Sequence, residues 1–334
     1  MRREPSFSSS LAPLFRRYLE LKRALGHDFS VGTQVLHFLD RFLSDSNNDS
    51  PDLTSNAFHH WCCDLERLTA GVRRIWMRTI YNFCLYRRRS EAQCFVPDPL
   101  LFPKPHQTIR PHIFSESDTA RLLAASSRLP RVTISPLRPE VIHLAIALLY
   151  STGMRRSELL SLTISDYDPT EDTLLISDSN FHKSRVLPLH RDLAEEINCY
   201  FQLRRKGHLP MSPDTPFIWN RIGGGRAYTG AALGKTALRA LCKQCNIRTA
   251  QETFPRVHDF RFSFVANVLL RWYRTGVDVN ARLPLLATYL GHVSILSTYY
   301  YLQFVEPIRT AASKRFADHY EKLVTPPSSK GDLR

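Results

Sequence analysis

A proline-rich stretch divides the chain and limits what can form on either side of it. Five prolines lie within residues 96–113, and a proline in a helix interior removes a backbone hydrogen bond and clashes with the preceding turn. We expect this stretch to be an extended, basic interdomain linker. A chain of 334 residues can bury two ordinary cores, so we expect one unit at 1–95, a larger one at 114–324 and a disordered tail at 325–334.

The residues before the linker show helical periodicity. Apolar side chains recur at helical spacing within about 11–25, 35–42, 55–68 and 70–88, which predicts a small all-helical unit with basic exposed faces. The last of these helices is expected to bury one side and to expose its arginines. The side expected to be buried consists of Ile75, Trp76, Ile80, Phe83 and Cys84.

The residues after the linker predict more helices and one small sheet. Two β-like runs, 172–177 and 184–189, flank a polar turn and predict a hairpin. The fold class is therefore mainly α with a small antiparallel sheet (α+β), without the βαβ alternation of a nucleotide-binding domain. Helices are expected from Ser115 and at 139–150, 155–162, 191–204, 229–245, 258–273, 283–290 and 306–323.

The charge of the chain indicates a polyanionic partner. The formal net charge is +14 and the isoelectric point is about 9.7. Basic clusters, such as the one at 204–206, recur within ordered-looking segments, which favours nucleic acid over an anionic membrane surface. The side chains that we expect to contact a DNA backbone are Arg73, Arg74, Arg78, Arg87, Lys104 and Arg110.

The cysteines and the apolar runs indicate the cellular compartment of the protein. Seven cysteines without a framework spacing fit a reducing compartment. Cys242 and Cys245 have CxxC spacing, but no second pair lies at zinc-site distance, so we expect helix-face positions and no metal. No secretory signal is visible, and the longest apolar run, Val141–Tyr150, is too short to span a bilayer. We therefore expect a cytoplasmic protein.

Two short motifs place phosphate-binding residue types at helical spacing. Arg155 follows a glycine break and lies three residues before Glu158, so the two can share a helical face. They form either a surface ion pair or a guanidinium held in place for a phosphate. His258 and Arg261 are spaced in the same way and could converge on one phosphate, although the spacing alone is a weak signal.

A third motif, Leu290-Gly291-His292, precedes three tyrosines at 299–301. Neighbouring residues on a helix point about 100° apart, so the three phenols cannot all serve one site. A histidine and a phenol brought together could attack a phosphate, or they could be core aromatics. Gly230 to Thr236 is similar to a phosphate-binding P-loop but has one residue too few between its glycines, and we expect it to be helical.

Taken in order, TGxRxxEL, a hairpin lysine, HxxR, LGH and a tyrosine resemble the tyrosine recombinase (phage integrase) family. The resemblance covers about 115–301, and the helical unit before it resembles the core-binding domain of that family more loosely. Residues 288–302 look most like integrases carried by transposons. The resemblance implies two domains that form a C-shaped clamp on DNA. One departure is a longer segment between Arg261 and His292 than is usual.

The resemblance also implies roles for the motif residues. Arg155 and Arg261 match the two arginines that bind the scissile phosphate, and Glu158 matches the acidic residue that orients the first of them. His258 matches a proton-transfer or phosphate-binding group. His292 matches a histidine that donates a hydrogen bond to a non-bridging oxygen.

Tyr301 matches the nucleophile, nine residues after the histidine of the LGH motif, which leaves Tyr299 and Tyr300 as packing or DNA-backbone residues. Lys183 matches the hairpin lysine that protonates the leaving 5′-oxygen, and Arg185 competes with it for that match. The implied reaction is a transesterification through a 3′-phosphotyrosyl link that uses no metal, ATP or other cofactor.

The resemblance implies double-stranded DNA with specific recombination sites as the partner, and a homotetramer on paired sites. It leaves open whether companion recombinases take part. The implied function is integration or excision of a mobile element in the bacterial cytoplasm, at the nucleoid. Two alternatives stay open at this point: a type IB topoisomerase-like enzyme that relaxes supercoils, and a non-catalytic DNA-binding accessory recombinase.

Overall fold

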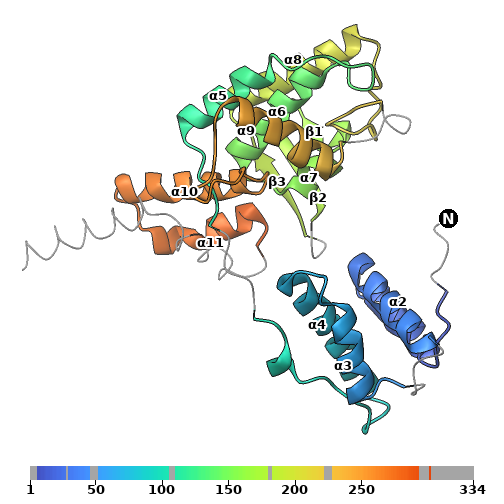
Figure 1. Ribbon diagram of the computed structural model, residues 1–334. Coiled ribbons are helices and arrows are strands. Elements are labelled where there is room, and N and C mark those ends of the chain that lie inside the picture. Colours follow the sequence, from blue (N-terminus) through green and yellow to red (C-terminus); the bar gives the residue numbers. More distant parts are fainter. Residues whose placement is uncertain are drawn as a thin grey trace, which may run out of the picture. The chain divides into compact units, whose positions relative to one another are not determined.

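The computed structural model describes residues 6–27, 29–45, 52–104, 110–179, 183–221, 228–292 and 301, without the side chains of 178, 179 and 183. The chain divides into two units, Met1–Ile109 and Arg110–Arg334 (Figure 1). The expected fold class, mainly α with a small antiparallel sheet, is confirmed. Tyr299, Tyr300, the helix expected at 306–323 and the tail at 325–334 lie outside the described residues.

The described part of the first unit is helical. Its elements are α1 (Ala12–Ala24), α2 (Ser30–Ser44), α3 (Ser55–Asp64) and α4 (Ala70–Arg87). One apolar side of each helix faces a common core, in which Phe15, Leu36, Trp61 and Phe83 are 0% exposed. Full burial of one such side chain contributes about 2 kcal/mol, so this core accounts for much of the stability of the unit.

Two expectations for α4 are wrong. Ile75 is 56% exposed, because it lies five positions before Ile80 and therefore points about 140° away from it on the helix. Arg87 is 8% exposed, and its guanidinium binds Asp52 at 2.8 Å and Glu91 at 2.7 Å. These carboxylates raise the pKa of Arg87 and occupy its donors, so it is a structural residue and not a DNA contact.

Each end of the proline-rich stretch packs on its own unit. A 3₁₀ turn, η1 (Pro99–Leu101), leads to Phe102, which is buried in the first core. Arg74 donates from Nη1 to the carbonyl oxygen of Pro103 at 2.8 Å. At the other end Phe114 is 0% exposed and stacks on Phe260 with 4.3 Å between ring centroids.

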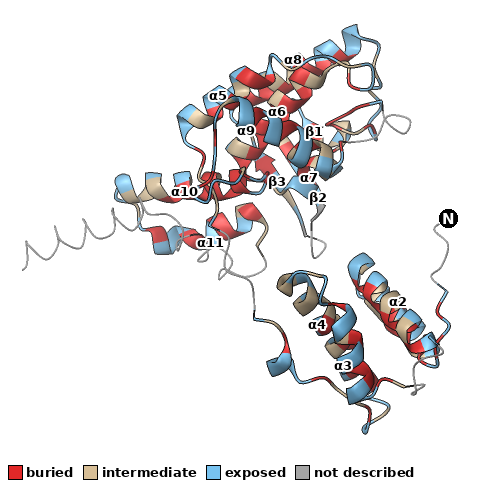
Figure 2. Ribbon diagram, in the orientation of Figure 1, coloured by how far each residue is buried: buried red, intermediate tan, exposed pale blue. Residues whose placement is uncertain are grey.

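The second unit is built around α6 (Arg138–Thr152), which is apolar on all sides and buried by α5 (Glu116–Ser126), α8 (Arg191–Lys206) and α10 (Asp259–Arg274) (Figure 2). A helix that is apolar all round belongs in a core. The helix expected from Ser115 is α5, and Ser115 and Asp118 cap its first turn by reciprocal hydrogen bonds. Within the described ranges, no helix is long and apolar enough to cross a membrane.

Further helical segments lie in the described part of the second unit. They are α7 (Arg156–Ser161), a π-helical segment η3 (Ala232–Leu238), α9 (Arg239–Gln244) and α11 (Val279–Leu290). The helix expected at 229–245 therefore contains a π-helical turn, and the one expected at 283–290 begins earlier. The long segment between Arg261 and His292 forms most of α10, a turn and the whole of α11.

A small antiparallel sheet has the strand order β1 (Tyr167–Asp168), β2 (Thr173–Ser179), β3 (Lys183–Pro188), with a 3₁₀ turn η2 (Ile164–Asp166) before it. The expected hairpin is β2 and β3, whereas β1 is too short to have been predicted. Leu174 pairs with Leu187, and Ile176 pairs with Arg185. Since alternate residues of a strand share a face, Arg185 lies on the same inward face as the buried Leu187.

A second basic cluster proves to be partly structural. Arg204 is 0% exposed and donates to the carbonyl oxygens of Pro216 and Phe217 at 3.0 and 3.2 Å. Burial lowers its pKa. The expectation that Arg204 binds a polyanion is therefore wrong, because its guanidinium is buried and donates to backbone carbonyl oxygens.

Candidate active site

Arg155 and Glu158 are placed by the break between α6 and α7. Gly153 ends α6 with φ +63°, and a Cβ atom there would lie 2.5 Å from the ring of Phe264, so the position requires glycine. Arg155 then precedes α7, and its backbone N and Nη1 each donate to Glu158 at 2.7 Å. Glu158 is 5% exposed and the side chain of Arg155 is partly buried, so the two do not form a surface ion pair.

Arg185 is the second partner of Glu158. Its Nη1 and Nη2 donate to the two carboxylate oxygens at 3.0 and 2.8 Å, and its side chain is 10% exposed. Such a two-pronged pair holds a guanidinium in one orientation. Burial alone would raise the pKa of Glu158, but the hydrogen bonds from Arg185 and Arg155 lower it to about 2. Glu158 is therefore ionised at neutral pH.

Arg261 lies at the centre of the site and is 1% exposed. Its Nη1 donates to the carbonyl oxygen of Gly153 at 2.9 Å, and its Nη2 donates to that of Leu290 at 2.7 Å and contacts Nε2 of His292 at 2.9 Å. Its Nε donates to the hydroxyl of Tyr301 at 3.3 Å. These contacts engage all but one of the N–H donors of a guanidinium.

The C-terminal end of α11 joins three arginines. The last carbonyl groups of a helix have no partner within the helix and carry the negative end of its dipole. Here three successive carbonyl oxygens each accept from a different guanidinium, at 2.8, 2.7 and 3.0 Å. The pairs are Tyr289 with Arg185, Leu290 with Arg261, and Gly291 with Arg155.

His292 follows this helix end. A guanidinium can only donate, so Nε2 of His292 accepts from Arg261, and a neutral ring must then carry its proton on Nδ1. Burial first, and then the positive charges of Arg261 and Arg155, lower the pKa of His292 to about 4. At neutral pH the ring is uncharged. In this arrangement the ring hydrogen is on Nδ1, so the hydrogen bond to a non-bridging oxygen that the resemblance implies would come from Nδ1.

Tyr301 is 5% exposed and packs against the core formed by α10 and α11. Its ring lies 4.6 Å from the ring of Phe262 and 5.7 Å from that of His292, measured between centroids. Its hydroxyl is at Nε of Arg261. The structure therefore brings Tyr301, His292 and Arg261 together, and Arg155 joins them through the end of α11.

His258 lies at the open edge of the site. It precedes α10, and its ring meets that of Phe262 edge-on at 5.4 Å. Loss of hydration and the positive charge of Arg261 lower the pKa of His258. Lys183 begins β3, but its side chain lies outside the described residues.

The cluster carries unbalanced positive charge. Arg155, Arg185 and Arg261 surround the single carboxylate of Glu158, and both histidines have lowered pKa values. Three guanidinium charges and one carboxylate leave these described groups with a net charge of about +2. Buried charge without a partner is costly, so the cluster is suited to receive an anion.

Three comparisons with known proteins bear on this geometry. The sequence profile of the phage integrase family matches residues 114–306. The tyrosine recombinase XerA of Pyrococcus furiosus is 30% identical over 304 residues, which are 90% of this chain and 91% of that protein. The chain belongs to the phage integrase family.

This chain has a second relative in the putative integrase/recombinase y4rB of Sinorhizobium fredii. The two are 29% identical over 94% of this chain and 99% of y4rB. The structure of the Tn1549 transposon integrase in complex with circular intermediate DNA aligns with a TM-score of 0.63 over 92% of this chain and 99% of that one, at 18% identity. This last match shows a shared fold. The resemblance to tyrosine recombinases is thereby confirmed.

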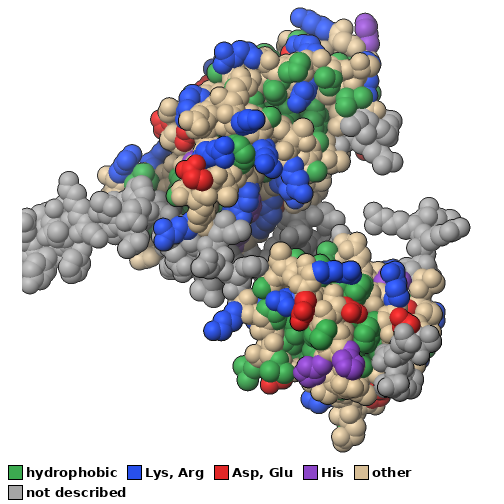
Figure 3. All heavy atoms as spheres, in the orientation of Figure 1, with side chains coloured by type: hydrophobic (Ala, Val, Ile, Leu, Met, Phe, Trp, Pro, Cys, Tyr) green, Lys and Arg blue, Asp and Glu red, His purple; other side chains and the backbone are tan. Residues whose placement is uncertain are grey.

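Sequence reasoning missed several basic side chains of this phage integrase family member. They line a groove beside Arg155 and His258 and come from α7, the π-helical segment, α9 and the loop before α10. Figure 3 shows Lys and Arg side chains gathered on the face of the second unit that it presents. The spacing of Gly230, Gly234 and Lys235 could have indicated this groove, because the two glycines lie close to Arg156 and Val257 on its other walls. The missed residues are Arg156, Lys235, Arg239, Arg248 and Arg256.

Proposed function

We propose that this chain is a site-specific recombinase that cuts and rejoins DNA through a 3′-phosphotyrosyl intermediate, with Tyr301 as the nucleophile. The observation that carries the proposal is the phenolic oxygen of Tyr301 at 3.3 Å from Nε of Arg261. A neutral phenol is a weak nucleophile, so attack needs nearby positive charge that stabilises the oxygen as it loses its proton. The arginine cluster supplies that charge.

In the proposed cleavage the Tyr301 oxygen forms a bond to phosphorus, and the bond from phosphorus to the 5′-oxygen breaks. The phosphodiester brings one negative charge and the phenolate a second. The two unbalanced guanidinium charges of the cluster match them, and electrostatic stabilisation of this kind commonly contributes more to catalysis than any other effect. Arg155 and Arg261 are proposed to hold the phosphate, and Glu158 to orient Arg155.

Two proton transfers accompany this step. We propose that the phenolic proton passes to His258, which has a lowered pKa and lies at the open edge of the site. Nε2 of His292 already accepts from Arg261, so a positioning role suits His292 better. Lys183 is proposed to protonate the leaving 5′-oxygen. Attack by a 5′-hydroxyl of another strand then reverses both transfers and releases Tyr301.

Double-stranded DNA is the proposed partner. The Tn1549 transposon integrase was solved with circular intermediate DNA, which supports this partner and a mobile element as the substrate. We further propose a homotetramer on paired sites, with or without companion recombinases, acting at the nucleoid in the bacterial cytoplasm. The exposed Arg78, Lys104 and Arg110 remain proposed backbone contacts, as do Arg73 and Arg74.

A nicked suicide duplex tests the proposal. The duplex spans an end of the native element, and its nick lets the 5′-hydroxyl fragment diffuse away, so that the covalent adduct accumulates. We expect an adduct with the unmodified chain, Tyr299→Phe and Tyr300→Phe, and none with Tyr301→Phe. Loss of the adduct in Tyr300→Phe but not in Tyr301→Phe would show that a different tyrosine attacks. The family matches favour neither the topoisomerase-like nor the accessory alternative.

A further inference from the structure

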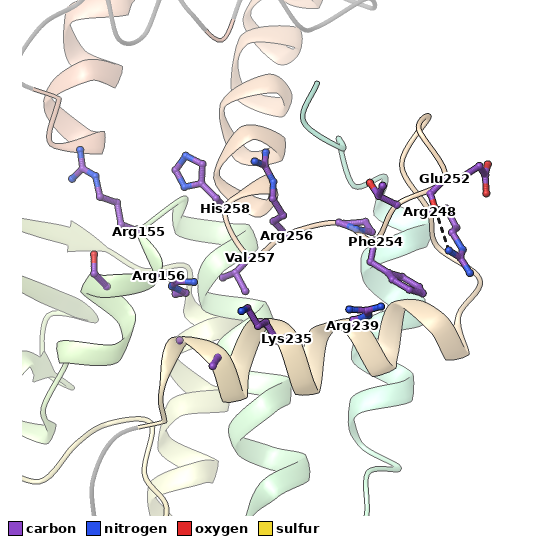
Figure 4. Close-up of a pocket in the computed structure, with 16 residues that line it drawn as sticks. Arg155, Arg156, Lys235, Arg239, Arg248, Glu252, Phe254, Arg256, Val257 and His258 are labelled. Carbon is purple, nitrogen blue, oxygen red and sulfur yellow. Dashed lines mark hydrogen bonds between the residues drawn. The ribbon is translucent and has the colours of Figure 1, made fainter. Parts of the chain in front are cut away.

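A groove of about 1180 Å³ lies beside the proposed active site, bordered by Arg155 and His258. The described lining contains six Lys or Arg residues and one acidic residue, Glu252. Figure 4 shows Lys235 and Arg239 on one helical segment, facing the loop that carries Phe254 and Arg256. A groove with such an excess of positive charge fits an extended polyanion.

Much of this charge is not committed to the fold. Arg256 pairs with Asp259 at 2.8 Å. Arg156, Lys235 and Arg239 are exposed and form no ion pair with any carboxylate in the described part of the chain. Free guanidinium groups present paired donors that match phosphate oxygens. The groove therefore has charge available for a ligand.

Two glycines bring the walls of the groove together. A Cβ atom on Gly230 would lie 3.0 Å from the guanidinium of Arg156, and one on Gly234 would lie 3.2 Å from Val257. The glycines therefore let the π-helical segment approach α7 and the loop before α10. This close approach accounts for the two glycines at 230 and 234, whose spacing is similar to that of a phosphate-binding loop. π-Helical turns also lie frequently at functional sites.

Phe254 holds two of the arginines. The guanidinium carbons of Arg239 and Arg248 lie 5.2 and 4.3 Å from the centroid of its ring. Arg248 also donates to the carbonyl oxygen of Glu252 at 3.1 Å. Stacking on an aromatic ring restricts a long side chain and leaves its N–H edge available. Two arginines from different elements are thus ordered around one ring before any ligand binds.

We propose that this groove binds the sugar-phosphate backbone next to the scissile phosphate, and that Arg239, Phe254 and Arg248 form a preorganised phosphate clamp. The inference rests on the proposed function for the position of the scissile phosphate at Arg155. Because Arg and Lys side chains can also donate to guanine edges, the assignment to the backbone is tested by comparing a recombination site with a scrambled duplex: phosphate contacts contribute equally to both.

The salt dependence of DNA binding tests the clamp. Each phosphate contact that is lost lowers the slope of log K against log salt by about 1. We expect Arg239→Ala and Arg248→Ala each to lower the slope by about 1, equally on a recombination site and on a scrambled duplex. Arg191→Ala is the matched control, since Arg191 is exposed on α8, pairs with Glu195 and lies outside the groove, and it should leave the slope unchanged.

Phe254→Leu separates preorganisation from charge. It should weaken DNA binding but keep the slope, because both guanidinium charges remain. Circular dichroism and the midpoint of thermal unfolding check that each variant folds, and Arg248→Gln replaces Arg248→Ala if that variant does not. Unchanged slopes in both arginine variants, or a loss confined to the recombination site, would overturn the proposal.

The outcome can be read separately from that of the proposed function. If the unmodified chain forms no adduct, the proposed function fails, while the slopes still report whether the groove binds DNA.

Discussion

The Nε of Arg261 lies 3.3 Å from the phenolic oxygen of Tyr301, so the proposed phosphate-binding arginine already holds the proposed nucleophile. Its other nitrogens are engaged by Gly153, Leu290 and His292. The scissile phosphate must therefore take the one remaining Nη1 hydrogen or replace an existing contact. Contact with Tyr301 is the easiest to replace, because it is the longest of the four.

This arrangement predicts that Tyr301→Phe separates binding from cleavage. Removal of the hydroxyl frees Nε of Arg261, and a hydrogen bond to a charged group is worth about 1.5 to 3 kcal/mol. We expect Tyr301→Phe to form no adduct yet to bind the recombination site at least as tightly as the unmodified chain. Fluorescence anisotropy measures the affinity. Binding that is weaker by tenfold or more would show that the phenol, and not Arg261, contributes the contact.

Glu158 should make the stability of the second unit sensitive to acid. Its pKa is lowered from 4.5 to about 2, so its contribution is complete above the unfolded-state value and is lost as the pH falls from about 4.5 towards 2. The difference in unfolding free energy between the unmodified chain and Glu158→Gln should be about 2 kcal/mol smaller at pH 3 than at pH 7. Urea unfolding at both pH values measures it, and an equal difference would contradict the assignment.

His292 should couple DNA binding to proton uptake. Its pKa is about 4 because of burial and the neighbouring arginines. A phosphate beside the ring favours the protonated form and raises that pKa, so DNA affinity should increase as the pH falls from 7 towards 5. His292→Gln should show a smaller increase. Calorimetry in buffers of different ionisation enthalpy counts the protons directly, and identical counts for the two proteins would refute the coupling.

The leaving-group acid can be identified with a sulfur-substituted substrate. A thiolate leaves without protonation, so a 5′-bridging phosphorothiolate removes the need for an acid. General acids contribute about 10² to 10⁴-fold. We expect Lys183→Ala to cleave ordinary DNA slower by about that factor and the phosphorothiolate at nearly the unmodified rate. Arg185→Ala should be slow on both substrates, because it acts through Glu158. Rescue of Arg185→Ala alone would transfer the role to Arg185.

The sequence predicted those features that depend on local spacing. The pairing of Arg155 with Glu158 and the hairpin follow from helical and strand periodicity, and the structure confirms both. The burial of Arg87 and Arg204 could not be predicted, because it depends on partners elsewhere in the fold, such as Asp52, which lies 35 positions away. Arg185 could have been found, since strand alternation places it on the same face as Leu187.

The groove was missed for a related reason. Its cations come from α7, from the continuous helix of η3 and α9, and from the loop before α10. Each of these segments carries basic residues that are unremarkable in a chain with a net charge of +14. These residues form one basic surface only because the fold brings their segments together. The π-helical conformation of η3 could not be predicted either, because its residue types fit an ordinary α-helix equally well.

The end of α11 has a consequence for how substitutions combine. Its three successive carbonyl oxygens are shared among Arg155, Arg185 and Arg261, so removal of any one guanidinium loosens the anchor of the other two. Losses from residues that act as a unit are not additive. In a double-mutant cycle, a second arginine substitution should therefore cost far less activity than the first. The phosphate site is gained or lost as a whole.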